Sequence, residues 1–176
     1  MTAIFPAPAR IVVLGSGNPS RGDDALGPAL MERVAGWIAR HPERPVVIVE
    51  DFQLQVEHAL DLRDRDLILF VDAAAAGPDP YAFRRCTPAA DRSCSTHALS
   101  PEALLHTYAS MGWGPLPPAF TLAVRGHDFE LGEGLSLEAL RNQEAAWAFL
   151  ARLLEHPNLS LWEELGAPCE DMLKPS

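Results

Sequence analysis

Two acidic side chains directly follow a glycine-rich turn near the start of the chain. The turn reads Gly-Ser-Gly-Asn-Pro-Ser-Arg-Gly-Asp-Asp from Gly15 to Asp24, and a helix is expected after it over residues 25–39. Such a turn suits a dinucleotide loop, but Ser20 stands where the third glycine of that fingerprint belongs. Asp23 or Asp24 would also occupy the helix N-terminus and repel a pyrophosphate. The same acids suit a cation in the neighbouring crevice, while a capping role for Asp24 alone explains them equally well.

Asp72 is a further candidate, because it ends the apolar run Leu-Ile-Leu-Phe-Val. Ligands of open parallel sheets bind beyond the carboxyl ends of the strands, where the strand order reverses. A strand order that begins 2-1-3 would place Asp24 and Asp72 over one crevice. His97 lies in a loop of small polar residues, from which an imidazole can project. Two carboxylates and an imidazole suit a divalent ion of the nickel or zinc kind, whereas a solvated Asp72 and a surface His97 are the alternatives.

Composition excludes several classes of protein. The 176 residues predict one domain, and 14 Lys and Arg against 24 Asp and Glu give a net charge of −10. This charge disfavours nucleic acid or an anionic membrane as the partner, and no apolar run is long enough to cross a bilayer. The chain has neither a G-x-S-x-G elbow nor a C-x-x-C pair, and its three cysteines favour a reduced, cytoplasmic protein.

Strand and helix patterns alternate along the chain, as in an α/β fold. Short apolar runs predict strands at residues 10–15, 45–50, 67–72 and 120–126, with a weaker, antiparallel one at 81–86 near an edge. Helical spacing and Ser caps predict helices over 25–39, 100–111 and from Ser136 to about 154, with one or two helical turns at 56–62. Residues 1–156 are expected to form the domain and 157–176 an appended tail, in which Leu161, Trp162 and Leu165 could dock as one turn of helix.

Three segments, GSGNPSRGDDALGP, LFVDAA and STHALSP, together resemble the hydrogenase maturation endopeptidases over about residues 10–155. The segment DFQLQVEH is similar to the subgroup that processes soluble, NAD-reducing nickel–iron hydrogenases. The resemblance implies a three-layer αβα sandwich around a twisted, mostly parallel sheet of about five strands. Ala25 departs from the glycine of many relatives, and Asp24 from their glutamate.

The resemblance also implies an activity and a site. The expected substrate is the precursor of a nickel–iron hydrogenase large subunit, from which the protease removes a C-terminal extension once nickel has been inserted. Asp24, Asp72 and His97 correspond to the metal site of the family, with the two acids as catalytic residues and Asn18 and Asp51 as expected substrate-binding residues. Nickel would be recognised in the substrate, and zinc or cadmium would substitute in the isolated protein, an expected monomer.

Two other functions remain open at this stage. A non-catalytic nickel-binding assembly factor would use the same three ligands. A peptidyl-tRNA hydrolase also carries a Gly-Asn-Pro turn after a strand, as at Gly17–Pro19, but its substrate requires a basic cleft that this acidic chain does not offer.

Overall fold

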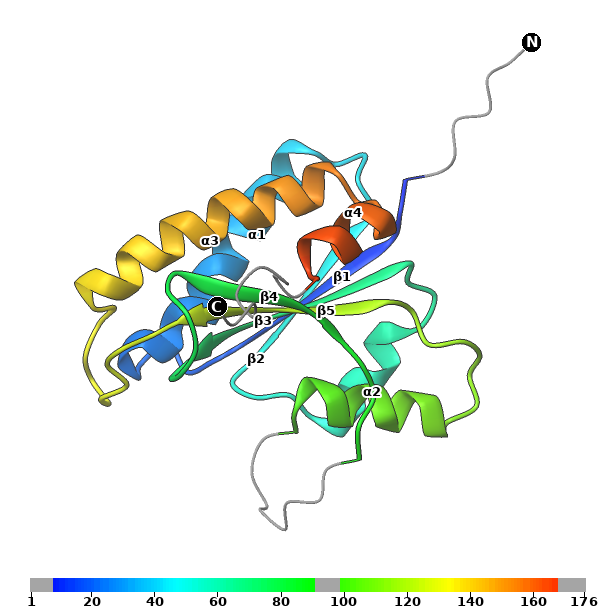
Figure 1. Cartoon of the computed structure of the whole chain (residues 1–176), viewed down its shortest axis with the longest axis horizontal. Helices are drawn as coiled ribbons and strands as arrows, with labels where there is room; N and C mark the ends of the chain where they lie inside the picture. Colours follow the sequence, from blue (N-terminus) through cyan, green and yellow to red (C-terminus); the bar gives the residue numbers. More distant parts are fainter. Residues whose placement is uncertain (1–7, 91–98, 168–176) are drawn as a thin grey trace, which may run out of the picture.

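The computed structural model describes residues 8–90 and 99–167, and its centre is a single five-stranded sheet (Figure 1). The strand order is β2-β1-β3-β5-β4, with every neighbouring pair parallel except β4 and β5, which are antiparallel. The strands are β1 (Ile11–Ser16), β2 (Val46–Asp51), β3 (Leu67–Ala74), β4 (Tyr81–Cys86) and β5 (Ala119–Arg125). The expected 2-1-3 order and the antiparallel edge strand are both confirmed.

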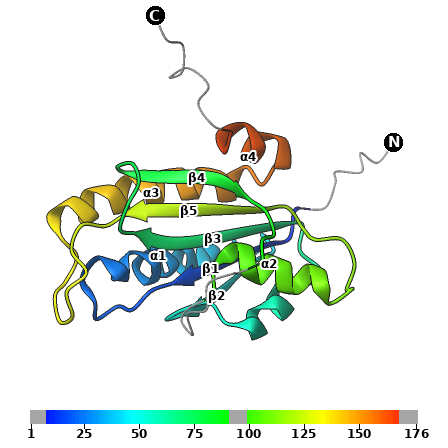
Figure 2. The same cartoon turned by 60° about the horizontal axis from the view of Figure 1, so that its bottom comes forward.

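Helices cover both faces of the sheet, which gives the predicted three layers (Figures 1 and 2). The helical elements are η1 (Gly22–Ala25), α1 (Leu26–Arg40), η2 (Val56–Leu62), α2 (Pro101–Ser110), α3 (Leu137–Glu155) and α4 (Leu159–Leu165), where η marks a 3₁₀-helix. In Figure 1, α1, α3 and α4 lie on one side of the sheet, and η2 and α2 on the other. The expected α/β sandwich is therefore confirmed.

Strand β1 explains why two hydrophobic cores form. Its apolar residues are all buried, and successive side chains of a strand point to opposite faces of the sheet. Ile11 and Val13 join the core under α1 and α3, whereas Val12 and Leu14 join the core under η2 and α2. A continuous run of branched apolar residues is therefore required at this central position.

Serine caps fix the starts of two helices where the sequence predicted them. The Ser100 hydroxyl accepts a hydrogen bond from the Ala103 N–H, and the Ser136 hydroxyl accepts one from the Ala139 N–H, each at 3.1 Å. These bonds satisfy N–H groups that have no partner within the helix. The cap of α3 has a second role, described below, because the Ser136 hydroxyl also donates to Asp23.

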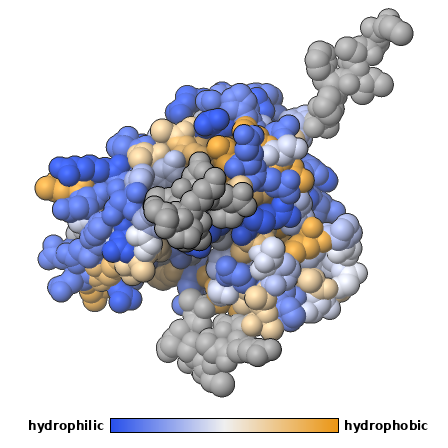
Figure 3. All heavy atoms as spheres, viewed as in Figure 1, coloured by the Kyte–Doolittle hydropathy of each residue, from blue (hydrophilic) through white to orange (hydrophobic). Residues whose placement is uncertain are grey.

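Hydrophilic residues dominate the surface seen in Figure 3, with smaller apolar patches between them. Most large apolar side chains of the described residues lie instead in the two cores. Across residues 8–90 and 99–167, no helix combines the length and the hydropathy that a bilayer crossing requires.

Helix α4 lies within the segment that the sequence analysis separated as a tail. Its Trp162 is fully buried and packs edge-on against Phe83 and Phe120 of the sheet. The indole N–H donates to the main-chain carbonyl of His156 at 3.1 Å, so its polar atom is satisfied as well. The first part of this segment thus contributes one of the largest side chains of the core.

We expect Trp162→Ala to lower the free energy of unfolding by about 3–5 kcal/mol, because it leaves a cavity between two aromatic rings. Urea denaturation followed by far-UV circular dichroism measures this change. Leu137→Ala is the matched control, since Leu137 is 70% exposed and should change stability by about 0.5 kcal/mol or less. A loss below about 1 kcal/mol for Trp162→Ala would contradict a core role for α4.

Candidate functional site

The carboxyl ends of β1 and β3 lie side by side, and this places the predicted acids at one edge of the sheet. Gly15 of β1 is paired with Val71 of β3, so Ser16 and Asp72 follow next to each other. The chain leaves β1 toward β2 on one side, whereas β3 lies on the other side. This is the reversal in strand order beyond which open parallel sheets bind ligands.

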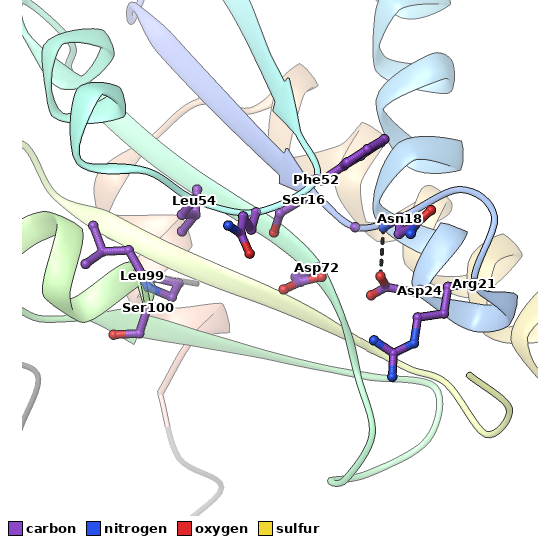
Figure 4. A pocket seen from close by; sticks show the side chains of 12 residues that line it. Ser16, Asn18, Arg21, Asp24, Phe52, Leu54, Asp72, Leu99 and Ser100 are labelled. Atoms are coloured by element: carbon purple, nitrogen blue, oxygen red, sulfur yellow. Dashed lines mark hydrogen bonds between the residues drawn. The ribbon is translucent and has the colours of Figure 1, made fainter. Parts of the chain in front are cut away.

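A cavity of about 510 Å³ opens at this point (Figure 4). Its lining includes three of the predicted site residues, Asn18, Asp24 and Asp72. The other lining residues are Ser16, Gly17, Arg21, Phe52, Gln53, Leu54, Leu99, Ser100 and Pro101. Figure 4 shows the carboxyl groups of Asp24 and Asp72 turned toward the same space.

Asp24 belongs to the turn rather than to a helix cap. One of its carboxylate oxygens accepts a hydrogen bond from the Asn18 N–H at 2.7 Å, and no side chain caps α1, which continues directly from η1. The capping alternative for Asp24 is therefore wrong. Gly17 allows the turn to close, because its φ is +143° and a Cβ there would collide with the carbonyl oxygen of Asp24.

Asp72 has an unusual protonation equilibrium. Its side chain is exposed at the mouth of the cavity, and the surrounding residues remove part of the water from its carboxyl group. This desolvation, strengthened by the charge of Asp24, raises the pKa of Asp72 to about 6 despite hydrogen bonds from the Ala73 N–H and with Ser16. Asp72 therefore changes its charge near neutral pH, as a proton-transferring group requires.

Asp23, the neighbour of Asp24, is fully buried and points away from the cavity lining. Its carboxylate accepts the N–H groups of His127, Asp128 and Ser136 at 2.7–2.9 Å and the Ser136 hydroxyl at 2.7 Å. Burial alone would raise the pKa of Asp23, but these hydrogen bonds together lower it. Asp23 is thus held as a structural anion.

Main-chain hydrogen bonds also join the turn around Asp23 to the loop that contains Asp128 and Glu133. The Asp23 N–H donates to the Asp128 carbonyl at 2.6 Å, the Gly22 N–H to Glu133 at 3.1 Å, and the Gly132 N–H to Ser20 at 2.8 Å. Residues 126–136 therefore form a buttress behind the turn that carries Asp24. Either acid was expected at the helix N-terminus and only Asp24 at the site; Asp24 lines the cavity, and Asp23 anchors the buttress.

Asp51 lies at the end of β2, beside the cavity but outside its lining. Its carboxylate accepts the Phe52 N–H at 2.7 Å and the Gln55 side-chain amide at 3.2 Å, and it lies 3.5 Å from the His58 Nε2. It also lines a second, adjoining cavity of about 280 Å³. These contacts organise the 52–55 loop, which forms part of the wall of the main cavity.

His97, the third predicted metal ligand, lies outside the described residues. Within 8–90 and 99–167, no group of three or more His, Cys, Asp or Glu side chains is arranged to hold a metal ion. Asp24 and Asp72 supply oxygen donors on one cavity, which fits two positions of the predicted ligand set.

Cys86, the cysteine that the structure describes, lies far from this chemistry. It pairs with Ala119 at the amino end of β5, whereas the two acids lie near the carboxyl ends of the parallel strands. Desolvation in the core raises the pKa of its thiol to about 12, so the thiolate needed for nucleophilic attack does not form near neutral pH. Cys86 is therefore not a candidate nucleophile, while Cys94 and Cys169 lie outside the described residues.

Sequence reasoning missed several of the residues that line the cavity. Ser16, Phe52 and Ser100 lie within the quoted segments but were not singled out as site residues, because their place on the cavity follows only from the meeting of separate loops. Arg21 lies within the quoted turn, and a basic residue close to two acids was the signal that could have marked it as a site residue.

The fold is that of the hydrogenase maturation proteases. A nickel–iron hydrogenase maturation protease, HycI from Thermococcus kodakarensis KOD1, superposes with a TM-score of 0.63 at 23% identity, over 87% of this chain and 97% of that one. The hydrogenase maturating endopeptidase HybD from E. coli gives 0.60 at 23% identity, over 83% and 93%. A hydrogenase 3 maturation protease gives 0.55 at 19% identity, over 81% and 90%.

No model of a protein family matches the chain, and no curated protein sequence does so either. The structural likenesses confirm the fold that the sequence resemblance implied. The narrower similarity to proteases of soluble, NAD-reducing hydrogenases stays a prediction.

We expect Asp23→Asn to lower the free energy of unfolding by about 3 kcal/mol at neutral pH, because an amide cannot accept all four hydrogen bonds. The difference from wild type should shrink in acid, since a lowered native pKa stabilises only above the pKa of the unfolded state. Urea denaturation at several pH values measures both effects. The exposed Asp64→Asn is the control, and equal stability of the two variants would contradict the structural role of Asp23.

Ionisation of Asp72 should destabilise the protein as pH rises. Because its native pKa of about 6 exceeds the unfolded value, the native state loses stability between about pH 4 and 6. Asp72→Asn should therefore melt at a higher temperature than wild type at pH 8, and the two should converge at low pH. In Asp24→Asn, the Asp72 pKa should fall but stay raised, as ¹³C carboxyl NMR would show. An Asp72 midpoint near 4 in wild type would contradict this description.

Proposed function

We propose that this chain is an endopeptidase that removes the C-terminal extension of a nickel–iron hydrogenase large-subunit precursor. The observation that carries the proposal is the pair Asp24 and Asp72 on one open cavity, at the ligand-binding edge of a hydrogenase maturation protease fold. The net charge of −10 also disfavours a nucleic-acid substrate. The cytoplasmic location and the monomeric state predicted from the sequence stay predictions.

Asp72 suits the proton transfers of peptide hydrolysis. A general base works best when its pKa lies near the working pH, and the pKa of Asp72 is about 6. In the proposed reaction its carboxylate takes a proton from the attacking water as the oxygen–carbon bond forms. It then returns that proton to the leaving amine as the carbon–nitrogen bond breaks.

Asp24 has a different part in this proposal. Its bond with the Asn18 N–H holds one carboxylate oxygen in place, which leaves the other free to orient a bound group. Its negative charge also helps to keep the pKa of Asp72 high. We expect Asn18 to act through this bond and through its place on the cavity wall.

Nickel enters the proposal as part of the substrate. Asp24 and Asp72, with His97 as the predicted third ligand, would contact nickel carried by the precursor. Such an incomplete ligand set binds a borderline cation only moderately by itself. A precursor that brings the metal with further ligands would bind better than one without it, which is the difference that a checkpoint needs.

The decisive experiment is cleavage of the matching precursor by purified protein, scored by the mass of the large subunit. We expect Asp24→Ala and Asp72→Ala each to lower the rate about 100-fold or more, because each removes a group at the reacting bond. Glu43→Ala is the matched control. Glu43 is an exposed acid in the loop between α1 and β2, which lies at the amino ends of the parallel strands, away from the cavity. Thermal melts establish that the variants are folded.

Precursor from nickel-starved and nickel-supplied cells separates the two halves of the proposal. Cleavage of the nickel-loaded form alone supports recognition of the metal in the substrate. Equal cleavage of both forms removes that recognition and leaves the endopeptidase. Binding of the loaded precursor without any cleavage would instead support a non-catalytic assembly factor and overturn the proposed activity.

A further inference from the structure

Arg21 brings a positive charge to the cavity that holds the two acids. It lies three residues before Asp24 in the same turn, and it is the one Lys or Arg among the described residues that line this cavity. Figure 4 shows its guanidinium group reaching into the space beside Asp24. The side chain is exposed, so a substrate can reach it.

One hydrogen bond orients the guanidinium group of Arg21 and leaves its terminal N–H groups available. Its Nε donates to the main-chain carbonyl of Phe129 at 3.1 Å, which fixes the plane of the group against the buttress loop. Among the described residues, none of the ion pairs involves Arg21. Since Arg21 lines the cavity and its terminal N–H groups have no carboxylate partner among the described residues, these groups are available to a bound substrate.

Peptide hydrolysis needs a group of this kind. When water adds to the carbonyl carbon, the π electron pair moves to the carbonyl oxygen, which becomes an anion until the carbon–nitrogen bond breaks. An ionised carboxylate can take up a proton but cannot stabilise that oxygen, because it only accepts hydrogen bonds. A guanidinium group carries donors and a fixed positive charge, and it is already oriented before the reaction.

We propose that Arg21 is a catalytic residue whose guanidinium group donates hydrogen bonds to the carbonyl oxygen of the cleaved peptide bond and stabilises its negative charge. The inference rests on the proposed endopeptidase function. It adds a third charged group to the two acids and separates their roles, since Asp72 moves the proton, Asp24 orients, and Arg21 holds the oxygen. No atom other than those of water and the peptide is needed to balance the reaction.

An alternative role for Arg21 predicts different kinetics. If it bound an acidic side chain of the precursor, its loss would weaken binding and raise KM with kcat unchanged. If it only fastened the turn to residue 129, its loss would lower stability, and added guanidinium ion would not restore activity. Stabilisation of the oxyanion affects kcat, because that charge exists only in the transition state and the intermediate.

The test compares Arg21→Gln, Arg21→Lys and Arg21→Ala with wild type on nickel-loaded precursor. We expect Arg21→Gln to lower kcat about 100-fold with KM changed less than about 3-fold, and Arg21→Lys to retain part of the rate through its charge. Guanidinium ion well below denaturing concentrations should partly restore Arg21→Ala. Arg40→Gln, at the far end of α1, is the matched control and should cleave at the wild-type rate.

The outcomes separate this inference from the function on which it rests. If wild-type protein does not cleave, the endopeptidase proposal fails. If wild type cleaves and Arg21→Gln cleaves equally fast, or changes KM alone, the assignment of Arg21 is overturned while the endopeptidase stands. If Arg21→Gln is slow and also melts at a much lower temperature than wild type, the rescue of Arg21→Ala decides. No recovery of Arg21→Ala activity with added guanidinium ion would overturn the proposal.

Discussion

The buried carboxylate of Asp23 is the constraint on which the site depends. A lone carboxylate in the interior of a protein is costly, and this one is tolerated because four donors surround it. Three of the donors are main-chain N–H groups of residues 127, 128 and 136, so the loop can satisfy Asp23 only in one conformation. That loop in turn holds the backbone of the preceding turn. The direction of Asp24, and with it the shape of the cavity, follows from this interaction.

The ionised form of Asp72, on the same cavity, is electrostatically unfavourable. Asp72 is desolvated and feels the charge of Asp24, and both effects oppose its ionisation. A protein selected only for stability would place an amide or an apolar side chain there. Strain of this kind is typical of functional sites, where groups are held ready for a partner instead of for the folded state alone. The rigid buttress behind the turn makes such an arrangement sustainable.

Most of the fold could be predicted from local sequence patterns, whereas the site depends on contacts between segments that are distant in the sequence. The apolar runs and the Ser100 and Ser136 caps each depend on a few neighbouring residues, and the structure agrees with them. The expectation that Asp72 ends its strand is wrong, since β3 continues beyond it to Ala74. The resemblance assigned Asp24 to the site, but the structural role of Asp23 could not be predicted, because its partners lie more than a hundred residues away. The sequence predicted a docked helical turn at Trp162 but not its partners, since Phe83 and Phe120 belong to β4 and β5.

Helix α4 gives the molecule a particular order of assembly. Domains begin to fold while their N-terminal parts emerge from the ribosome. All five strands precede residue 126, yet the apolar surface over Phe83 and Phe120 is covered completely only when Phe149 and Trp162 have been synthesised. A nascent chain that already contains the complete sheet therefore exposes an aromatic patch, and such a patch is a binding surface for chaperones or for other unfinished chains. The closing of this patch by α4 marks the point at which the chain no longer needs such protection.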